Sequence, residues 1–159
     1  MSKILKVKAR QIFDSRGNPT IEAEVFTKKN SALAICPSGA STGTYEAFEK
    51  RDNNNKKYLG KSVFKAVENI NGPIAKALVD IDSTDQSKID KTLIDLDGTE
   101  QKKKLGANAI LAVSLASCKL AAIEKKISLF QHLGNSKSNQ LPIPLLNIIN
   151  GGLHAKNNL

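Results

Sequence analysis

Apolar and polar residues alternate in two segments near the amino terminus, residues 4–9 and 20–25, with Leu5 on the apolar side of the first. A period of two is typical of strands that bury one face. Turn-forming residues, DSRGNP, separate the two segments, so they predict an antiparallel hairpin. A third apolar segment, residues 32–36, follows the turn KKNS and ends at Pro37. Together the three segments predict a three-stranded antiparallel meander.

The periodicity changes after Gly60, where apolar residues recur every three or four positions and therefore share one helical face. These residues are Val63, Val67, Ile70, Ile74 and Leu78. Pro73 interrupts the series and predicts a kink or a break after Gly72, with Pro73 starting the second piece.

Two further helices are predicted. One covers about residues 85–96 and ends at the turn DGT. The other covers residues 108–124, which are apolar on nearly every side and so predict a helix in the middle of a helical layer. Strands first and helices afterwards define an α+β fold, here a three-stranded antiparallel meander plus a helical layer.

The carboxyl-terminal part of the sequence has a different pattern. Residues 133–140, LGNSKSNQ, are polar and typical of a linker. The segment LPIPLLNIINGG that follows is a short apolar run and predicts a strand buried on both faces, as in parallel sheets. We therefore expect one domain over residues 1–135, followed in residues 136–159 by a linker and the first strand and loop of a second domain.

Composition limits the classes of function that fit the chain. The chain has 159 residues, of which 40% are hydrophobic, so it can bury one sizeable core. Its net charge of +9 comes almost entirely from lysine and only 4% of its residues are aromatic, which argues against nucleic-acid binding. No apolar run approaches the roughly 20 residues of a membrane span, and the lysine-containing start lacks the apolar core of a secretion signal. These features predict a cytoplasmic protein without a membrane span.

Candidate metal and redox motifs are absent from the sequence. Cys36 and Cys118 are far apart and neither has a paired cysteine or histidine at a ligand spacing. We interpret both as buried thiols.

Residues 38–44 are all small or hydroxylated, which a packing role explains poorly because such side chains bury little surface. Gly39 and Gly43 permit close approach of the backbone, and the hydroxyls stand beside backbone amides, so the segment can fold over an anion and move as a lid. The alternative is an ordinary connection that caps a following helix through Thr44. The segment lacks the lysine of a Walker phosphate loop.

The chain has two histidines. His154 follows the predicted strand, at the edge where α/β enzymes place ligand-binding groups, although a surface histidine that only forms hydrogen bonds is an equal alternative. His132, near Phe130 at a predicted helix end, is interpreted as a capping or packing residue.

Four segments carry a resemblance to a known family, and they read FDSRGNPTIEAEV, PSGASTGTYEAFEKRD, LDGTEQKKKLGANAILAVSLA and PIPLLNIINGGLHAKNN. In this order and at these separations they are similar to the amino-terminal third of enolase. The resemblance implies that residues 1–135 form the enolase capping domain and that the following residues begin an α/β barrel of the TIM type. It also implies the reversible dehydration of 2-phosphoglycerate to phosphoenolpyruvate in glycolysis, with Mg²⁺, by a homodimer or higher homo-oligomer.

The resemblance assigns roles to individual positions. A lid that closes over substrate would comprise Ser38, Gly39, Ala40, Ser41, Thr42, Gly43 and Thr44. Ser41 matches a serine that ligates the second magnesium ion, and His154 matches a histidine that contacts the substrate. The turn that presents this histidine would be shaped by Asn150, Gly151 and Gly152. Residues 14–17 match a turn toward the barrel and the subunit contact, and residues 51–61 depart from the family pattern in a way expected to alter only surface charge.

The resemblance also implies what the chain lacks. The general base, the general acid and the carboxylate ligands of the first magnesium ion would lie beyond Leu159, so the chain alone is expected to be inactive. The alternative hypothesis is a noncatalytic, truncated capping domain that acts as a binding module, and the family leaves a surface or secreted location open. Sequence beyond Leu159 distinguishes the two.

Overall fold

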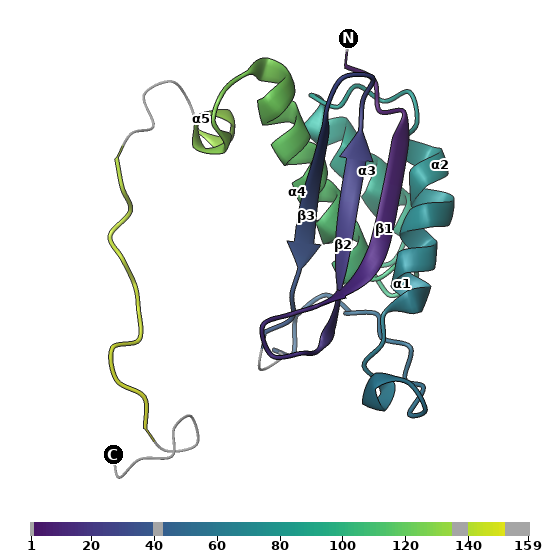
Figure 1. Ribbon diagram of the computed structural model, residues 1–159, viewed down its shortest axis with the longest axis vertical. Helices are drawn as coiled ribbons and strands as arrows, with labels where there is room; N and C mark the ends of the chain where they lie inside the picture. The colour runs from purple at the N-terminus through teal and green to yellow at the C-terminus, as the bar shows by residue number, and fades with distance from the viewer. Residues whose placement is uncertain (1, 40–42, 135–139, 152–159) are drawn as a thin grey trace.

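The computed structural model describes residues 2–39, 43–134 and 140–151. Its three strands form one antiparallel sheet in the order β1-β2-β3. They are β1 (Lys6–Phe13), β2 (Pro19–Phe26) and β3 (Ser31–Cys36). The helices that follow cover one face of the sheet and leave the other open (Figure 1). The predicted meander and the α+β class are therefore confirmed.

The two faces of the sheet differ in chemistry because side chains alternate along each strand. On the covered face, Ile21, Ala23 and Val25 of β2 are fully buried. On the open face, Arg10 of β1 forms an ion pair with Glu22, which lies directly opposite in β2. The covered face supplies the core, whereas the open face carries charge.

The amino-terminal end of β1 departs from the predicted alternation. Ile4 is fully buried and Leu5 is 52% exposed, so the prediction that Leu5 faces the core is wrong. The strand begins only at Lys6, and before it the backbone N–H of Ile4 donates to the carbonyl of Ile81 at 2.8 Å. This contact with a loop turns Ile4 inward and breaks the period of two.

The first helical region continues past Pro73 in a π-helical turn, so of the two predicted outcomes, a kink or a break, the break is wrong. Its segments are the 3₁₀ turn η1 (Tyr58–Gly60), the helix α1 (Phe64–Asn69), the π-helical turn η2 (Ile70–Ile74) and the helix α2 (Ala75–Leu78). Proline has no N–H and its ring clashes with an ordinary α-helical turn. The wider turn accommodates it, because the N–H of Ala75 also reaches the carbonyl of Ile70, five residues back.

The predicted apolar face of this region is confirmed as a buried face. Val63, Ile70, Ile74 and Leu78 are at most 1% exposed, and Val67 packs against them. The π-helical turn also brings an amide to the edge strand β1. Asn71 accepts from the N–H of Ala9 at 2.8 Å and donates to its carbonyl at 3.0 Å. One side chain thus satisfies both backbone groups of a strand residue that has no strand partner on this side.

Helix α3 (Gln86–Asp97) confirms the next predicted helix. The side chain of Asp85 caps its start by accepting from the N–H of Lys88 at 3.0 Å. Gly98, with φ 66°, ends it in the left-handed conformation expected of a helix C-terminus.

Helix α4 (Ala107–Lys125) packs across β2 and β3. With 19 residues and a mean hydropathy of 1.4 it is apolar enough to cross a membrane, but its burial against the sheet accounts for this composition. One side of the helix remains uncovered, since Leu111 and Leu115 are 48% and 41% exposed. The prediction of a helix within the helical layer agrees with the contacts of α4 with α1, α3 and the sheet, although one of its sides stays uncovered.

The last helix, α5 (Leu129–Leu133), is short and begins with a capping box between Ser128 and Gln131. His132 lies in its last turn, with Nδ1 3.5 Å from Nζ of Lys125. Burial and the neighbouring ammonium group lower the pKa of His132. His132 is half-buried at the end of α5, which agrees with its interpretation as a capping or packing residue at a helix end.

Residues 140–151 do not form the predicted strand. They run extended and apart from the sheet and helices (Figure 1), and Leu141 and Leu145 are 89% and 98% exposed. A strand needs a neighbour for its backbone hydrogen bonds, and within the described ranges no strand lies beside this segment.

One buried carboxylate holds the loop after α3. Asp97 is 2% exposed and accepts from the N–H of Thr99 at 3.0 Å and from the N–H of Leu105 at 2.7 Å. The Thr99 hydroxyl donates to it as well. Burial alone would raise the pKa of Asp97, but these hydrogen bonds outweigh it and lower the pKa below its ordinary value.

We expect Asp97→Ala to lower the free energy of unfolding by about 3 kcal/mol at neutral pH, because it leaves buried donors without an acceptor. A carboxyl group whose pKa is lowered by folding stabilises the fold above its unfolded pKa of about 4 and loses this contribution as the pH falls through the folded value. Urea unfolding in steps from neutral to acidic pH should therefore show the two proteins converging only below about pH 4. Asp95→Ala, at an exposed position of the same helix, is the control. A difference that is independent of pH would contradict the role of the charge.

Candidate functional site

The lid that the resemblance assigns is described only at its ends. Its described members are Ser38, Gly39, Gly43 and Thr44. The candidate residues that lie outside the described ranges are Ala40, Ser41, Thr42, Gly152 and His154. Ser41, the predicted metal ligand, and His154, the predicted substrate contact, are among these, so their meeting at one site stays a prediction. The ends of the segment, in contrast, have defined contacts.

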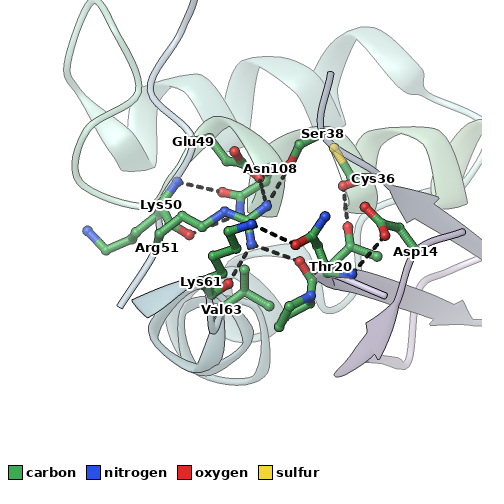
Figure 2. A network of polar contacts seen from close by, with 12 residues as sticks. Asp14, Thr20, Cys36, Ser38, Glu49, Lys50, Arg51, Lys61, Val63 and Asn108 are labelled. Carbon is green, nitrogen blue, oxygen red and sulfur yellow. Dashed lines mark hydrogen bonds and ion pairs between the residues drawn. The ribbon is translucent and has the colours of Figure 1, made fainter. Parts of the chain in front are cut away.

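Ser38, the first residue of the predicted lid, is held in a polar network (Figure 2). Its hydroxyl donates to Oε1 of Glu49 and accepts from Nη2 of Arg51 at 2.7 Å. Its carbonyl accepts from Nη2 of Arg16 at 2.8 Å. Both the side chain and the backbone of Ser38 are therefore fixed by groups from other segments of the chain.

Arg51 connects this network to the body of the domain. Its Nη1 donates to the carbonyl of Pro19 at 2.8 Å and to the carbonyl of Lys61. Its Nη2 forms an ion pair with Glu49 at 2.7 Å. The side chain of Arg51 is only 17% exposed, so its charge is largely removed from water and depends on these partners. A planar guanidinium can donate in several directions at once, which suits this position.

The turn between β1 and β2 directs Arg16 toward Ser38. Oδ1 of Asp14 accepts from the N–H groups of Asn18 and Arg16, both at 2.9 Å. These hydrogen bonds, the one from Asn18 first, lower the pKa of Asp14. The turn that the resemblance assigns to a contact with the barrel and another subunit thus also contacts Ser38 within the chain.

No helix follows the lid. Glu46 accepts from the N–H of Gly43 at 2.8 Å, and residues 46–50 are not helical. The alternative in which Thr44 caps a following helix is therefore wrong. The chain instead runs to the loop between α3 and α4, where the N–H of Phe48 donates to the carbonyl of Gln101 at 2.7 Å.

Lys50 lies against the start of α4. Asn108, which is 4% exposed, accepts from the N–H of Lys50 and donates to its carbonyl, both at 3.1 Å. Gly106 permits this approach, because a Cβ atom there would lie 2.6 Å from Cβ of Lys50. These hydrogen bonds fix the backbone at Lys50 and therefore also help to position its neighbours Glu49 and Arg51 (Figure 2).

A hollow of about 810 Å³ lies between residues 36–49 and the helices α3 and α4. Ser38 and Glu49 of the network contribute to its wall on one side, and Asp90 and Ser114 on the other. The Ser114 hydroxyl donates to Asp90 at 2.7 Å and so links the two helices. Ser38, at the start of the predicted lid, therefore borders a cavity.

The described residues offer no set of ligands for a metal ion. Within residues 2–39, 43–134 and 140–151, no three His, Cys, Asp or Glu side chains gather closely enough to bind one. Ser41, the predicted magnesium ligand, lies outside these ranges. Cys36 and Cys118 are free and half-buried, which agrees only in part with their interpretation as buried thiols. Burial raises the pKa of both thiols, which disfavours the reactive thiolate.

Sequence interpretation did not identify Arg16 and Arg51 as residues of the site. It predicts that the asparagines within residues 51–61 alter only surface charge, and it assigns no role to Arg51. The structure shows that Arg51 is largely buried, and that Asp52 accepts from the first N–H groups of α1 at 2.9 and 3.0 Å. The charged run EKRD was the available signal, but sequence alone does not show which of its charges turn inward.

Comparisons with known proteins agree with this fold. The family model described as the enolase N-terminal domain matches residues 4–133, which defines the class of the domain. The enolase of Pelagibacter ubique (strain HTCC1062) is 65% identical to the chain over 159 residues. The alignment covers 100% of this chain and 38% of that protein. The chain belongs to the enolase family, and it spans 38% of the length of this curated relative.

Proposed function

We propose that the chain is the amino-terminal part of a phosphopyruvate hydratase, which interconverts 2-phosphoglycerate and phosphoenolpyruvate in glycolysis and gluconeogenesis. The observation that carries the proposal is the 65% identity to an enolase over the whole chain. The catalytic base, the catalytic acid and most metal ligands would be supplied from beyond Leu159. The chain alone would therefore be inactive.

The proposed roles within the chain follow from the resemblance. Residues 1–135 would form the capping domain and residues 136–159 would begin the barrel. Residues 38–44 would close over the substrate, and His154 would contact it near its phosphate end. The complete enzyme would work in the cytoplasm as a homodimer or higher homo-oligomer.

The reaction removes a proton beside a carboxylate that is already ionised, so that proton is very weakly acidic. Bound Mg²⁺ would supply the concentrated positive charge that makes its removal feasible. Ser41 is the residue of this chain that we propose as a magnesium ligand, since hard oxygen donors suit this ion.

The test is to express the polypeptide encoded by the whole reading frame and to follow the conversion of 2-phosphoglycerate by the ultraviolet absorbance of phosphoenolpyruvate. Conversion should require magnesium, and the chain of 159 residues should show none. A reading frame that ends at Leu159 would favour the binding-module hypothesis. An intact, folded product that fails to convert 2-phosphoglycerate would overturn the proposal.

We expect Ser41→Ala, in the polypeptide encoded by the whole reading frame, to raise the magnesium concentration at half-maximal activity by about tenfold or more. Residues that only support metal ligands already change metal affinity by about 10–100-fold, and a direct ligand should matter at least as much. Ser31→Ala is a matched control, because the Ser31 hydroxyl donates to Glu24 at an exposed position of the sheet. An unchanged magnesium titration for Ser41→Ala would contradict the assignment.

A further inference from the structure

The aromatic side chains of this domain lie at its surface. The chain has five phenylalanines and two tyrosines, and none of them is among the buried residues of the described structure. Aromatic side chains bury large areas and usually contribute strongly to cores, and on protein surfaces they are enriched where partners bind. A cluster of aromatic side chains on this surface is therefore a candidate interaction site.

Three of these rings form one cluster where residues 53–60 and the turn between β1 and β2 meet at the same end of the domain (Figure 1). Phe13, the last residue of β1, lies 5.5 Å from the ring of Tyr58, centroid to centroid. The ring of Tyr58 in turn lies 6.4 Å from that of Phe64, the first residue of α1. Leu59, next to Tyr58 in the chain, is 85% exposed and adds an aliphatic side chain. We call Phe13, Tyr58, Leu59 and Phe64 the aromatic patch.

The loop that carries Tyr58 and Leu59 is closed and strained. The N–H of Asn53 donates to the carbonyl of Gly60 at 3.0 Å and so closes its base. Tyr58 and Leu59 have φ 49° and 52°, in the left-handed region that bulky residues rarely adopt. Such a conformation costs free energy and is often found at functional sites. Because Leu59 is mostly exposed, packing within the described part of the chain does not explain an apolar side chain in this conformation.

Lysines give the aromatic patch a positive rim. Residues 53–67 contain no acidic residue and four exposed lysines, Lys56, Lys57, Lys61 and Lys65. Nζ of Lys57 lies 5.5 Å from the centroid of the Phe64 ring. The carboxylates of Asp14 and Asp52, which adjoin these segments in the sequence, already accept hydrogen bonds from backbone N–H groups. The patch therefore combines an apolar centre with positive charge at its edge.

Charge complementarity indicates what this surface can bind. Ammonium groups around an apolar centre attract an acidic segment that carries an apolar side chain. Pairing of the patch with itself across a two-fold axis is disfavoured, because it would bring the lysines of both copies together. The rings also form a poor platform for stacked nucleobases, since neighbouring rings are inclined by 60° and 50° and Lys57 lies over Phe64.

We propose that the aromatic patch is a docking surface for a partner protein, which binds through an acidic segment with an apolar residue at its centre. The apolar residue contacts Leu59 and the rings, and the carboxylates on either side face the lysines of the rim. This role goes beyond the proposed activity and does not depend on it, because no residue of the patch is assigned to the reaction.

The test is calorimetric titration of the polypeptide encoded by the whole reading frame with a probe peptide, acetyl-DEDFEDE-amide. We expect the probe to bind and its affinity to fall as the salt concentration rises, because salt screens exposed charges. Replacing the central phenylalanine of the probe by alanine should weaken binding by about tenfold or more, since a few central anchors carry most of the binding energy. The charge-reversed peptide KRKFKRK should not bind.

The variant Leu59→Asn separates docking from folding. Asparagine adopts the left-handed conformation more readily than leucine, so Tm should stay unchanged or rise slightly. The affinity for the probe should nevertheless fall by about tenfold, because the exposed apolar side chain is lost. Leu133→Asn makes the same substitution at another exposed leucine, in α5, and should leave the affinity unchanged.

A second pair of variants tests the positive rim. Lys57→Gln combined with Lys65→Gln should weaken binding of the probe by about fivefold, the size expected for exposed charge pairs. Lys88→Gln combined with Lys91→Gln, at exposed positions of α3, is the matched control and should have no effect.

Four results would overturn the proposal. If the probe does not bind the unmodified polypeptide, the patch is covered by other parts of the chain or has no acidic partner. If Leu59→Asn dissociates an oligomer in analytical ultracentrifugation, the occupant is a second copy of the polypeptide. Tighter binding of single-stranded oligothymidine than of the probe, lost in Leu59→Asn, would identify a nucleic-acid site. Equal losses of affinity in the two pairs of lysine variants would show that the probe responds only to the net positive charge.

Discussion

Replacing Gly106 by alanine should lower the free energy of unfolding by about 4 kcal/mol, the sum of backbone strain and steric overlap. Gly106 has φ 101°, and an added Cβ would lie 2.6 Å from Cβ of Lys50 and 2.7 Å from Oδ1 of Asn108. To relieve this overlap, Lys50 would have to move away from α4 and give up the paired hydrogen bonds with Asn108. Thermal unfolding followed by circular dichroism should show a fall in Tm of roughly 10 °C.

Two other glycines separate the causes of this effect. Gly17 has φ 75° but no atom within 4 Å of an added Cβ, so Gly17→Ala measures backbone strain alone. Gly72 also has open space around it and no positive φ, so Gly72→Ala should be nearly neutral. We expect the loss of stability to be greatest at Gly106 and smallest at Gly72. Equal losses at Gly106 and Gly17 would show that the close approach of Lys50 contributes nothing.

In the polypeptide encoded by the whole reading frame, His154→Ala should lower kcat by about 100-fold or more and leave Tm nearly unchanged. The resemblance places this imidazole against the substrate, and the loss of one positioned donor at a reacting group typically costs about 10²–10³-fold in rate. Steady-state turnover of 2-phosphoglycerate and thermal unfolding of the same preparation provide the two measurements.

His132→Ala is the natural control for this experiment, because the chain contains two histidines and His132 lies at the end of α5. It should affect Tm slightly and kcat not at all. The opposite pattern, in which His154→Ala reduces stability more than turnover, would identify His154 as a structural residue and leave the proposed substrate contact without support.

The sheet and most helices could be predicted because their signals are local. Alternation and turn residues define the three strands, and the spacing of Val63, Ile70 and Ile74 defines a buried helical face. The failures occur where distant contacts override the local pattern. Leu5 faces solvent because the residue before it bonds to Ile81, a partner that periodicity cannot indicate.

The helix through Pro73 and the segment 140–151 show two further limits of prediction from sequence. At Pro73 the backbone changed its hydrogen-bonding pattern instead of ending the helix, and residue spacing alone does not distinguish the two responses. Residues 140–151 have the composition of a buried strand, but a strand forms only beside a neighbour. The composition of a segment therefore does not show whether a neighbouring strand is available to pair with it.

The unusual composition of the sequence predicted the candidate site, but it did not predict the residues that hold this site in place. The run of small residues after Pro37 singled out residues 38–44, since packing could not explain it. Arg16 and Arg51 hold Ser38 from positions 22 and 13 residues away, on different segments. Nothing in a single sequence selects these two arginines from its other cations, because the choice depends on the path of the chain in space.

The separation of residues 140–151 from the folded part of the chain has a consequence for synthesis. The buried hydrophobic side chains of the described structure all lie between Ile4 and Ala122. Translation proceeds at about 5–20 residues per second, which is slow compared with the folding of most small domains. The nascent chain can therefore close this core on the ribosome before residues 140–151 emerge, and these residues then expose hydrophobic side chains that a chaperone could bind.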